Sequence, residues 1–383
     1  MSGKIVVAHV ITKLELGGAQ LNTLYTVEHL DPARFDAYLL CGPGGILRTR
    51  LSAEDRLVIV PALDRKICFS RDIQALFQIV RLFKRIRPQI VHTHSSKAGI
   101  LGRVAARLAG VPVIVHSVHG FSFSPFQPFF VRRFYLFAEK ICRRLTNHFV
   151  FVAHGDIDLA RRHGLVTDNF SLIRSGFPLV RFAAAGDAAE AKRKYALPAD
   201  SFVCGMVAPF KPQKGLFHLA AIAALVIARD PAVFFIIAGD GEQRLALEAE
   251  LQRLGIAGNF RLPGFIRDVE NAMDAFDIGI STALWEGLPQ SLVQLRLKKK
   301  AIVASDIAGN REVVRDGKNG FLLPAADHDR FAAAILKLAG DAGLRRKLGG
   351  FDAEDFSEWS ADVLVARQED LYQRLLVNSW TGG

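Results

Sequence analysis

Short apolar segments alternate with longer amphipathic segments along the whole chain, and this rhythm limits the fold more than any other feature of the sequence. The expected strands lie at residues 4–10, 37–40, 57–60, 90–94, 113–118, 202–207, 234–238, 260–262, 278–281 and 301–304. The clearest helical patterns lie at residues 19–29, 71–85, 98–108, 216–228 and 243–254. Such alternation predicts an α/β protein whose parallel sheets are covered by helices on both faces.

The same rhythm occurs twice, and 383 residues are too many for one typical domain. A loop with Gly and Pro near residues 175–182 separates the halves. We expect a first domain over residues 1–178 and a second over 179–360, with residues 361–383 forming a helix that packs back on the first domain. Two Rossmann-like, doubly wound domains that face each other across a cleft would bind ligands at the carboxyl ends of their strands.

Several classes of protein are disfavoured by composition. No apolar run reaches the ~18 residues of a transmembrane helix, and the N-terminus has the pattern of a buried strand rather than a signal peptide. The four cysteines are scattered without a C-x-x-C pair, so we expect reduced thiols in a cytoplasmic protein.

Charge is distributed unevenly. Residues 1–180 hold 24 Lys and Arg against 12 Asp and Glu, whereas the rest of the chain holds 25 against 26. The net charge of +11 therefore comes from the first half. A basic half of this kind indicates an anionic partner. The candidates are membrane lipid, a lipid-linked phosphate and nucleic acid. Nucleic acid is disfavoured because the chain has no recognised nucleic-acid-binding motif.

The segment around Glu286 carries the clearest chemical signal. Glu286 stands before Gly287, Leu288 and Pro289, where a helix is expected to begin because Pro fits a first helical turn. A helix N-terminus attracts an anion such as a phosphate. A carboxylate beside a bound phosphate indicates recognition of attached hydroxyl groups, as in a nucleotide sugar. The alternative is that Glu286 only complements the helix dipole.

Two further loops follow expected strands. Gly17 and Gly18 lie between the first strand and the first helix, where backbone can approach a ligand closely. Lys214 immediately precedes Gly215 at a helix start, so its ammonium can reach a phosphate held there. Taken singly, the Gly pair is also explained by a structural turn, and the lysine by an ordinary surface position.

Histidines gather at two strand ends, as the pairs His92 with His94 and His116 with His119. Alternate residues of a strand point to one face, so zinc has to be considered. A third ligand would have to come from elsewhere, because no Cys or acidic residue lies nearby in sequence. Hydrogen bonding to a ligand, or to neighbours in the core, is the favoured interpretation, and we expect no metal.

These loops occur in one order together with IAGDGE, LPGF, GNREVV and DGKNGFLLP. The combination resembles the retaining glycosyltransferases of family 4, the group-1 glycosyltransferases, which have the GT-B fold. The segment KAGILGRVAARLAGVPVIVHSVHGF is similar to a subgroup that acts in bacterial surface-polysaccharide and lipopolysaccharide assembly. The resemblance implies a hexosyltransferase that moves a sugar from a nucleotide-diphosphate sugar, a UDP-sugar above all, to a glycan or lipid-linked acceptor. It implies no metal or other cofactor.

The resemblance also assigns roles by position. It implies that Glu286 holds sugar hydroxyls, that His119 contacts the donor sugar near the reacting centre, and that Lys214 pairs with the pyrophosphate. These roles make Glu286 and His119 the candidate catalytic residues. The other candidate donor-binding residues are Gly17, Gly18, Lys214, Gly264, Gly287, Leu288 and Gln294.

The sequence departs from the family pattern at three places. Gln294 replaces a second glutamate, and losing that charge is expected to weaken nucleotide binding about tenfold. Pro209 replaces an arginine, so one phosphate-binding cation is missing. A run of lysines at residues 298–300 replaces a small residue, and it suits either a helix C-terminus or an anionic partner. Two alternatives stay open. One is a sugar-nucleotide 2-epimerase, which shares the fold, and the other is a non-catalytic GT-B binding protein, which the departures at Gln294 and Pro209 favour.

The acceptor is expected on the basic first domain, residues 1–178, and the nucleotide-sugar donor on the second, residues 179–360. Residues 121–144 mix aromatic with basic side chains, and Phe130, Phe134 and Phe137 fall on one helical face. Such a mixture is typical of a segment that lies on an anionic membrane. The alternative is that the aromatics fill the domain core. The first interpretation predicts a cytoplasmic protein that associates peripherally with the inner face of the membrane.

Overall fold

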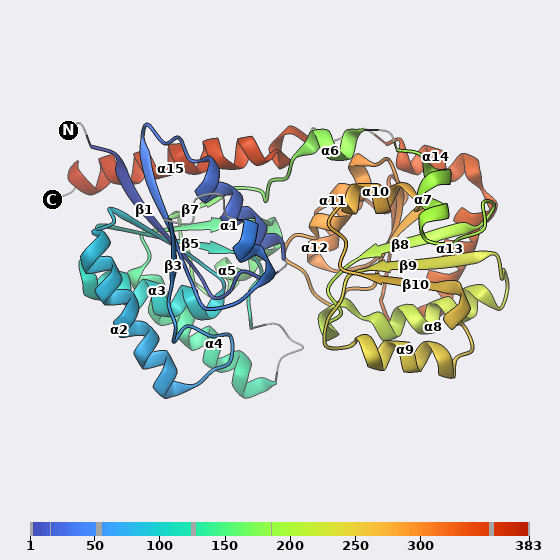
Figure 1. Cartoon of the computed structure of the whole chain (residues 1–383), viewed down its shortest axis with the longest axis horizontal. Helices are drawn as coiled ribbons and strands as arrows, with labels where there is room; N and C mark the ends of the chain where they lie inside the picture. Colours follow the sequence, from blue (N-terminus) through green and yellow to red (C-terminus); the bar gives the residue numbers. More distant parts are fainter. Residues whose placement is uncertain are drawn as a thin grey trace. The chain divides into compact units, whose positions relative to one another are not determined.

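The computed structural model describes residues 3–15, 17–50, 56–123, 128–184, 186–351 and 356–381 (Figure 1). The chain divides into two compact units. The first unit consists of Met1–Phe177 with Ser357–Gly383, and the second of Pro178–Phe356. The roles expected for them, acceptor binding for the first and donor binding for the second, stay predictions.

A seven-stranded parallel sheet forms the centre of the first unit, in the order β3-β2-β1-β4-β5-β6-β7. Its strands are β1 (Ile5–Ile11), β2 (Phe35–Cys41), β3 (Leu57–Ile59), β4 (Ile90–His94), β5 (Val113–Val118), β6 (His148–Phe151) and β7 (Phe170–Leu172). The helices of this unit are α1 (Gly18–His29), α2 (Phe69–Ile86), α3 (Ser96–Ala109), α4 (Phe129–Cys142), α5 (His154–Arg162) and α15 (Ala361–Thr381).

A six-stranded parallel sheet forms the second unit, in the order β10-β9-β8-β11-β12-β13. Its strands are β8 (Phe202–Val207), β9 (Val233–Ala238), β10 (Phe260–Gly264), β11 (Ile278–Ser281), β12 (Ala301–Ser305) and β13 (Gly320–Leu323). Its helices are α6 (Leu179–Ala183), α7 (Ala188–Lys194), α8 (Leu216–Ile227), α9 (Arg244–Arg253), α10 (Val269–Asp274), α11 (Gln290–Leu297), α12 (Ala308–Arg311), α13 (His328–Gly340) and α14 (Ala342–Gly349).

The expected class of fold, two doubly wound parallel sheets, is confirmed. In each sheet the strand order reverses once, between β1 and β4 in the first and between β8 and β11 in the second. Ligands of such sheets bind where the order reverses, because the loops at the carboxyl ends of those two strands diverge and leave room. Strands β6, β7 and β13, which have three or four residues each, were not predicted.

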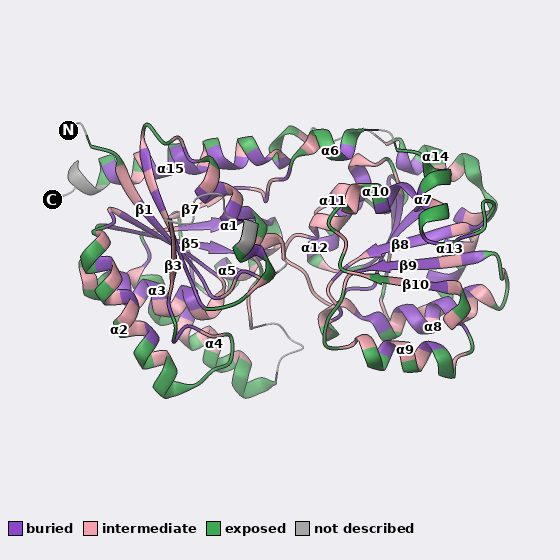
Figure 2. Ribbon diagram, in the orientation of Figure 1, coloured by how far each residue is buried: buried purple, intermediate pink, exposed green. Residues whose placement is uncertain are grey.

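The cores follow from the apolar pattern. Figure 2 shows that the central strands are buried along their length, whereas helices are buried along one face. In α2, Ala75, Ile79 and Phe83 face the core at helical spacing. Helix α15 returns to the first unit, where the backbone N–H of Ala361 donates to the carbonyl of Phe177 and Tyr372 is completely buried.

Two smaller expectations bear on chemistry. All four cysteines are free, and only Cys68 is exposed. Within the part of the chain that the structure describes, no helix combines the length and the apolarity needed to cross a membrane.

Candidate functional site

Lys214 and Glu286 meet at the point of the second sheet where the strand order reverses. Lys214 ends a short helical turn (Pro212–Lys214) in the loop after β8, and Glu286 lies in the loop after β11. The Lys214 ammonium forms an ion pair with the Glu286 carboxylate. The two side chains are only 14% and 11% exposed. The sequence places these residues 72 positions apart, and the adjacency of β8 and β11 brings them together.

Neighbouring contacts hold this ion pair in place. Gln213 donates from Nε2 to the Trp285 carbonyl (2.8 Å) and to Oε2 of Glu286 (3.3 Å). The Leu284 N–H donates to the Gln213 carbonyl at 2.8 Å, and the Thr282 hydroxyl donates to the Lys214 carbonyl at 3.0 Å. Hydrogen bonds therefore join the loop after β8 to the loop after β11. Gln213 is a candidate site residue that the sequence analysis missed.

Glycines allow close packing around the pair. Gly215 has a φ of +61°, and a Cβ there would lie 2.1 Å from the Thr282 carbonyl oxygen. Gly309, in α12, packs against the backbone of Glu286 and Gly287 so tightly that a Cβ would lie within 2.7 Å of both. These approaches require glycine, because any side chain would push the two loops apart.

The loops after β9 and β10 continue the same edge of the sheet. The Gly239 N–H donates to the Gly264 carbonyl at 2.9 Å, and Gly264 itself has a φ of +75°. The Phe210 N–H donates to the Asp240 carbonyl at 2.9 Å, which joins the loop after β9 to that after β8. Gly264 thus belongs to a continuous row of loops that includes Lys214, and its donor-binding role stays a prediction.

The segment after Glu286 leads into α11. This helix begins at Gln290, and Pro289 is its N-cap. The sequence analysis expected Pro289 inside the first turn, so the helix begins one residue later than expected. Gly287 and Leu288 lie in the preceding loop, and Gln294 is a half-buried residue of the second turn. The donor-binding roles of these three residues stay predictions.

The lysine run at the end of α11 divides into different roles. Lys298, 5% exposed, donates to the Asp274 carboxylate (2.8 Å) and to the Ala184 carbonyl (2.9 Å). Lys299 is exposed and adopts a left-handed conformation with a φ of +55°. Lys298 is therefore a structural cation that pairs with Asp274, and its charge is not free for an anionic partner.

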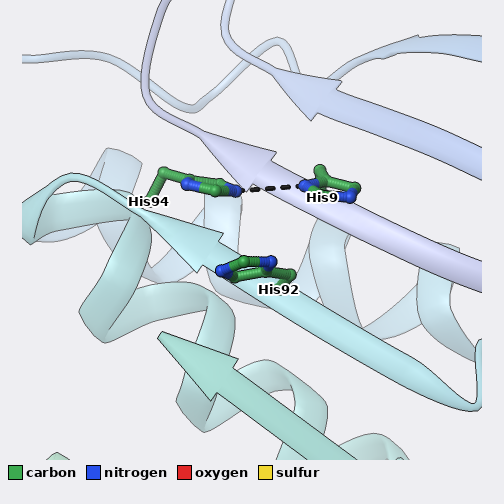
Figure 3. A group of neighbouring side chains, drawn as sticks. All are labelled: His9, His92 and His94. Atoms are coloured by element: carbon green, nitrogen blue, oxygen red, sulfur yellow. Dashed lines mark hydrogen bonds between the residues drawn. The ribbon is translucent and has the colours of Figure 1, made fainter. Parts of the chain in front are cut away.

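A second cluster of polar side chains lies where the strand order of the first sheet reverses. His9 of β1 and His92 of β4 are directly paired in register, and His94 follows two residues later on the same face. Figure 3 shows the three rings side by side, with the bond from His9 Nδ1 to His94 Nε2 that spans 3.0 Å. His9 is the third member that the sequence analysis could not supply, and strand pairing brings it in from 83 residues away.

These three residues have the grouping of a metal site, since one nitrogen of each lies within 4.8 Å of the others. Hydrogen bonds already engage all their ring nitrogens. His92 bonds Tyr372 (2.6 Å) and Ser117 (2.7 Å), and His9 also bonds Tyr372 at 3.4 Å. The remaining nitrogen, Nδ1 of His94, bonds Nε2 of His119 at 3.3 Å. The cluster is thus explained as a hydrogen-bonded network, and the absence of a metal stays a prediction.

Burial keeps these imidazoles neutral. Removal from water lowers the pKa of His9 to about 3 and that of His119 to about 4. The pKa values of His92 and His94 are also lowered well below the ordinary histidine value, first by burial and then by neighbouring histidines. His116 does not join the cluster, because its Nδ1 bonds the Thr93 hydroxyl at 2.9 Å as a satisfied core histidine.

His119 follows β5 and lies beside α1. A small cavity next to it is lined by polar residues, among them Asn22, Thr23, His94, Ser117, His119 and Gln368, together with apolar residues. Gly18 begins α1 and Gly17 is its N-cap, with an extended φ of −177° that any residue can adopt. The backbone at position 17 therefore does not require glycine. The ligand contacts predicted for Gly17, Gly18 and His119 stay predictions.

Comparison with known proteins identifies the class. Residues 16–181 match the model of Glycosyltransferase Family 4, and residues 187–351 match that of Glycosyl transferases group 1. The chain is 32% identical over 380 residues, 98% of each protein, to the UDP-Gal:alpha-D-GlcNAc-diphosphoundecaprenol alpha-1,3-galactosyltransferase of Escherichia coli. It is 26% identical over 332 residues to the putative glycosyltransferase EpsD of Bacillus subtilis, covering 85% of this chain and 86% of EpsD.

Solved structures agree on the fold. Anabaena HepE in complex with UDP and glucose matches with a TM-score of 0.82 at 18% identity, over 97% of this chain and all of that one. The chain is thus a glycosyltransferase. It belongs to the group-1, family-4 glycosyltransferases, as its motifs predicted.

Proposed function

We propose that this protein is a retaining glycosyltransferase that transfers a hexose from a UDP-sugar to a lipid-diphosphate-linked sugar in the synthesis of a bacterial surface glycan. The observation that carries the proposal is the Lys214–Glu286 pair at the point where the second sheet reverses its strand order. A cation for a diphosphate and a carboxylate for sugar hydroxyls stand side by side there. The Escherichia coli relative, whose name specifies UDP-Gal and a diphosphoundecaprenol-linked acceptor, supports these choices of donor and acceptor.

The proposed reaction uses basic groups in place of a metal. Lys214 exchanges Glu286 for the donor diphosphate, and Glu286 accepts hydrogen bonds from the sugar hydroxyls. The bond from the anomeric carbon to the diphosphate oxygen breaks while the acceptor oxygen attacks from the same face. The departing diphosphate takes the proton of the acceptor hydroxyl. An α-linked donor therefore gives an α-linked product, with no cofactor besides the nucleotide sugar.

A donor screen tests the activity. The protein is incubated with UDP-, GDP- and ADP-sugars, with and without α-GlcNAc-diphosphoundecaprenol, and nucleoside diphosphate release is followed. We expect release of UDP that requires this acceptor, with UDP-galactose the first donor to test. Interconversion of the sugars without acceptor would identify a 2-epimerase instead. Binding of a donor without any product would identify a non-catalytic protein.

Substitution of the carboxylate tests the site. Glu286→Gln keeps the size of the side chain but removes the charge, so kcat/KM should fall roughly 10- to 100-fold. Glu250→Gln is the matched control, because Glu250 pairs with Arg253 on the exposed surface of α9 in the same unit. Equal activity of the wild type and the Glu286→Gln variant would remove Glu286 from the site.

We also propose that α4 docks the enzyme on an anionic bilayer, where a lipid-linked acceptor lies. Phe129, Phe130, Phe134 and Phe137 are exposed on this helix, Phe130 by 82%, so these four rings do not fill the core. The Arg132 and Arg133 guanidinium groups lie over the Phe129 ring, at 5.9 and 5.6 Å from its centre. Of the stretch 121–144, residues 124–127 lie outside the described residues, and Phe123 is buried.

Rings flanked by arginines suit the headgroup region, where apolar surface is buried beside anionic lipid. Flotation with phosphatidylcholine vesicles, with and without phosphatidylglycerol, tests this docking. We expect binding only to the anionic vesicles, and its loss in the double variant Arg132→Glu with Arg133→Glu. Arg346→Glu with Lys347→Glu changes the net charge equally on exposed residues of α14 in the second unit and should still bind. Equal flotation of both double variants would contradict the proposal.

A further inference from the structure

A continuous chain of hydrogen bonds runs from the C-terminal helix to His119. The Tyr372 hydroxyl, on α15, bonds Nε2 of His9 at 3.4 Å. His9 Nδ1 bonds His94 Nε2 at 3.0 Å, and His94 Nδ1 bonds His119 Nε2 at 3.3 Å. The residues come from α15, β1, β4 and the loop after β5, so the chain of hydrogen bonds exists only in the folded first unit.

Neutral imidazoles give this chain a direction. A neutral histidine has one ring N–H donor and one bare nitrogen acceptor. Since burial holds His9, His94 and His119 neutral, each ring that donates at one nitrogen accepts at the other. Only two arrangements of protons satisfy all the bonds, with every ring donating toward Tyr372 or every ring donating toward His119. The tautomer of His119 therefore depends on the far end of the chain.

The surroundings of Tyr372 select the first arrangement. Its hydroxyl has one proton and donates it to Oε1 of Gln368 at 3.2 Å. The phenolic oxygen is then an acceptor for His9 Nε2–H and for His92 Nδ1–H, the latter at 2.6 Å. The Ser117 hydroxyl lies 2.7 Å from the other nitrogen of His92 and donates to it, which agrees with the same arrangement. His94 consequently donates to His9, and His119 donates from Nε2 to His94.

We propose that Tyr372 is a positioning residue for sugar transfer. Acting through His9 and His94, it fixes His119 as the Nε2–H tautomer, whose bare Nδ1 accepts a hydrogen bond from a hydroxyl of the donor sugar. The inference rests on the proposed function, in which His119 contacts that sugar. It makes the C-terminal helix part of the catalytic apparatus, although Tyr372 itself does not touch the substrate.

The full-length Tyr372→Phe variant tests the chain, because it removes the hydroxyl but keeps the ring that packs against Phe35 and His92. Tyr25→Phe is the matched control. Tyr25 also ties α15 to the unit, through a 2.9 Å bond to Asp362, but it has no part in the histidine chain. Gln368→Met is a second test variant, since it removes the acceptor that orients the Tyr372 proton.

Two readouts separate positioning from packing. The first is the tautomer of His119, measured from ring ¹⁵N shifts of histidine-labelled protein and assigned with a His119→Asn variant. The second is kcat and KM for transfer from the active UDP-sugar. We expect Tyr372→Phe and Gln368→Met to move His119 away from the Nε2–H tautomer and to lower kcat about fivefold, with KM for the donor much less affected. Tyr25→Phe should change neither.

Three results would overturn the inference. They are an unchanged His119 tautomer in Tyr372→Phe, equal loss of kcat in Tyr372→Phe and Tyr25→Phe, and stoichiometric zinc in the purified protein. Zinc would occupy the nitrogens that the chain requires. The tautomer measurement needs no turnover, so a tautomer change in a protein without transferase activity would support the chain and reject the proposed function.

Discussion

At the scale of single residues, the two charged side chains of the proposed donor site pair with each other. Lys214 and Glu286 neutralise each other while both are nearly buried. An unpaired charge in a poorly solvated place would cost free energy, and the ion pair avoids this for both side chains. A donor that brings a diphosphate and hydroxyl groups replaces both partners at once, so the pair suits a site that opens only to a ligand offering both.

The left-handed backbone conformation of Lys299 costs free energy of folding, and a substitution can remove that cost. Its N–H donates to the Arg296 carbonyl (2.9 Å) and that of Lys300 to the Leu295 carbonyl (3.0 Å), the pattern of a Schellman end that favours glycine. Lys299→Gly should raise the free energy of unfolding by about 0.5–1 kcal/mol, measured by urea denaturation. Lys299→Ala keeps the Cβ and is the control. The explanation fails if alanine stabilises as much as glycine.

At the scale of elements, α4 is fastened to α3 by a buried ion pair. Arg103, completely buried, donates from one guanidinium nitrogen to both Glu139 oxygens at 2.9 and 2.8 Å, and from Nε to the Gly99 carbonyl. This contact lies on the inner side of a helix whose outer face carries the exposed phenylalanines. It lets α4 expose apolar rings without leaving the unit.

Removing one partner of that pair leaves a buried charge uncompensated. Glu139→Gln should therefore lower the free energy of unfolding by roughly 3–5 kcal/mol, measured by urea denaturation. The double variant Arg103→Met with Glu139→Leu should recover much of the loss, because no charge then remains to be paired. A loss below about 1 kcal/mol in Glu139→Gln, as for a surface pair, would contradict this account.

Buried and half-buried histidines of the first sheet, among them His9 on β1 and His148 on β6, make stability depend on pH. The unfolded chain binds protons at histidine near pH 6.5, whereas burial lowers the pKa of His9 to about 3 and that of His148 to about 4. The free energy of unfolding should therefore fall as pH is lowered from 6.5, by about 1.4 kcal/mol per pH unit for each such histidine, and level off below the folded-state values.

Urea denaturation between pH 7.5 and 5.5 measures this slope above the range where most carboxylates titrate. His9→Asn has one buried imidazole fewer and should show a shallower slope. A free energy of unfolding that stays constant across this window would show that the cluster is protonated in the folded protein.

At the scale of the whole molecule, the proposed roles divide between two units. UDP should therefore protect backbone amides of residues 208–215 and 282–290 from hydrogen exchange, because these loops meet at the Lys214–Glu286 pair. Amides of α2, in the first unit, should be unaffected. Lys214→Ala should weaken the protection at a given UDP concentration. Protection confined to the first unit would reverse the assignment of donor and acceptor roles.

Much of the fold was predictable from the sequence. Parallel strands that are buried on both faces appear as continuous apolar runs, and the helices that cover them show apolar residues with a period of 3.6. The short strand β7 and the brief helix α12 carry too few residues for such a period. Among site residues, Lys214 and Glu286 were found from local motifs. Gln213 and His9 were missed, because their neighbours come from distant strands.

The sequence by itself determined the family, the class of fold and the candidate chemistry of Glu286, Lys214 and His119, since these depend on local motifs and on the order of strands and helices. Only the tertiary structure decided which distant residues meet. The adjacency of β8 and β11 pairs Lys214 with Glu286, and the register of β1 on β4 sets His9 beside His92. Helix α15 brings Tyr372 to the same histidines. Such contacts are fixed by strand order and packing, which no local pattern specifies.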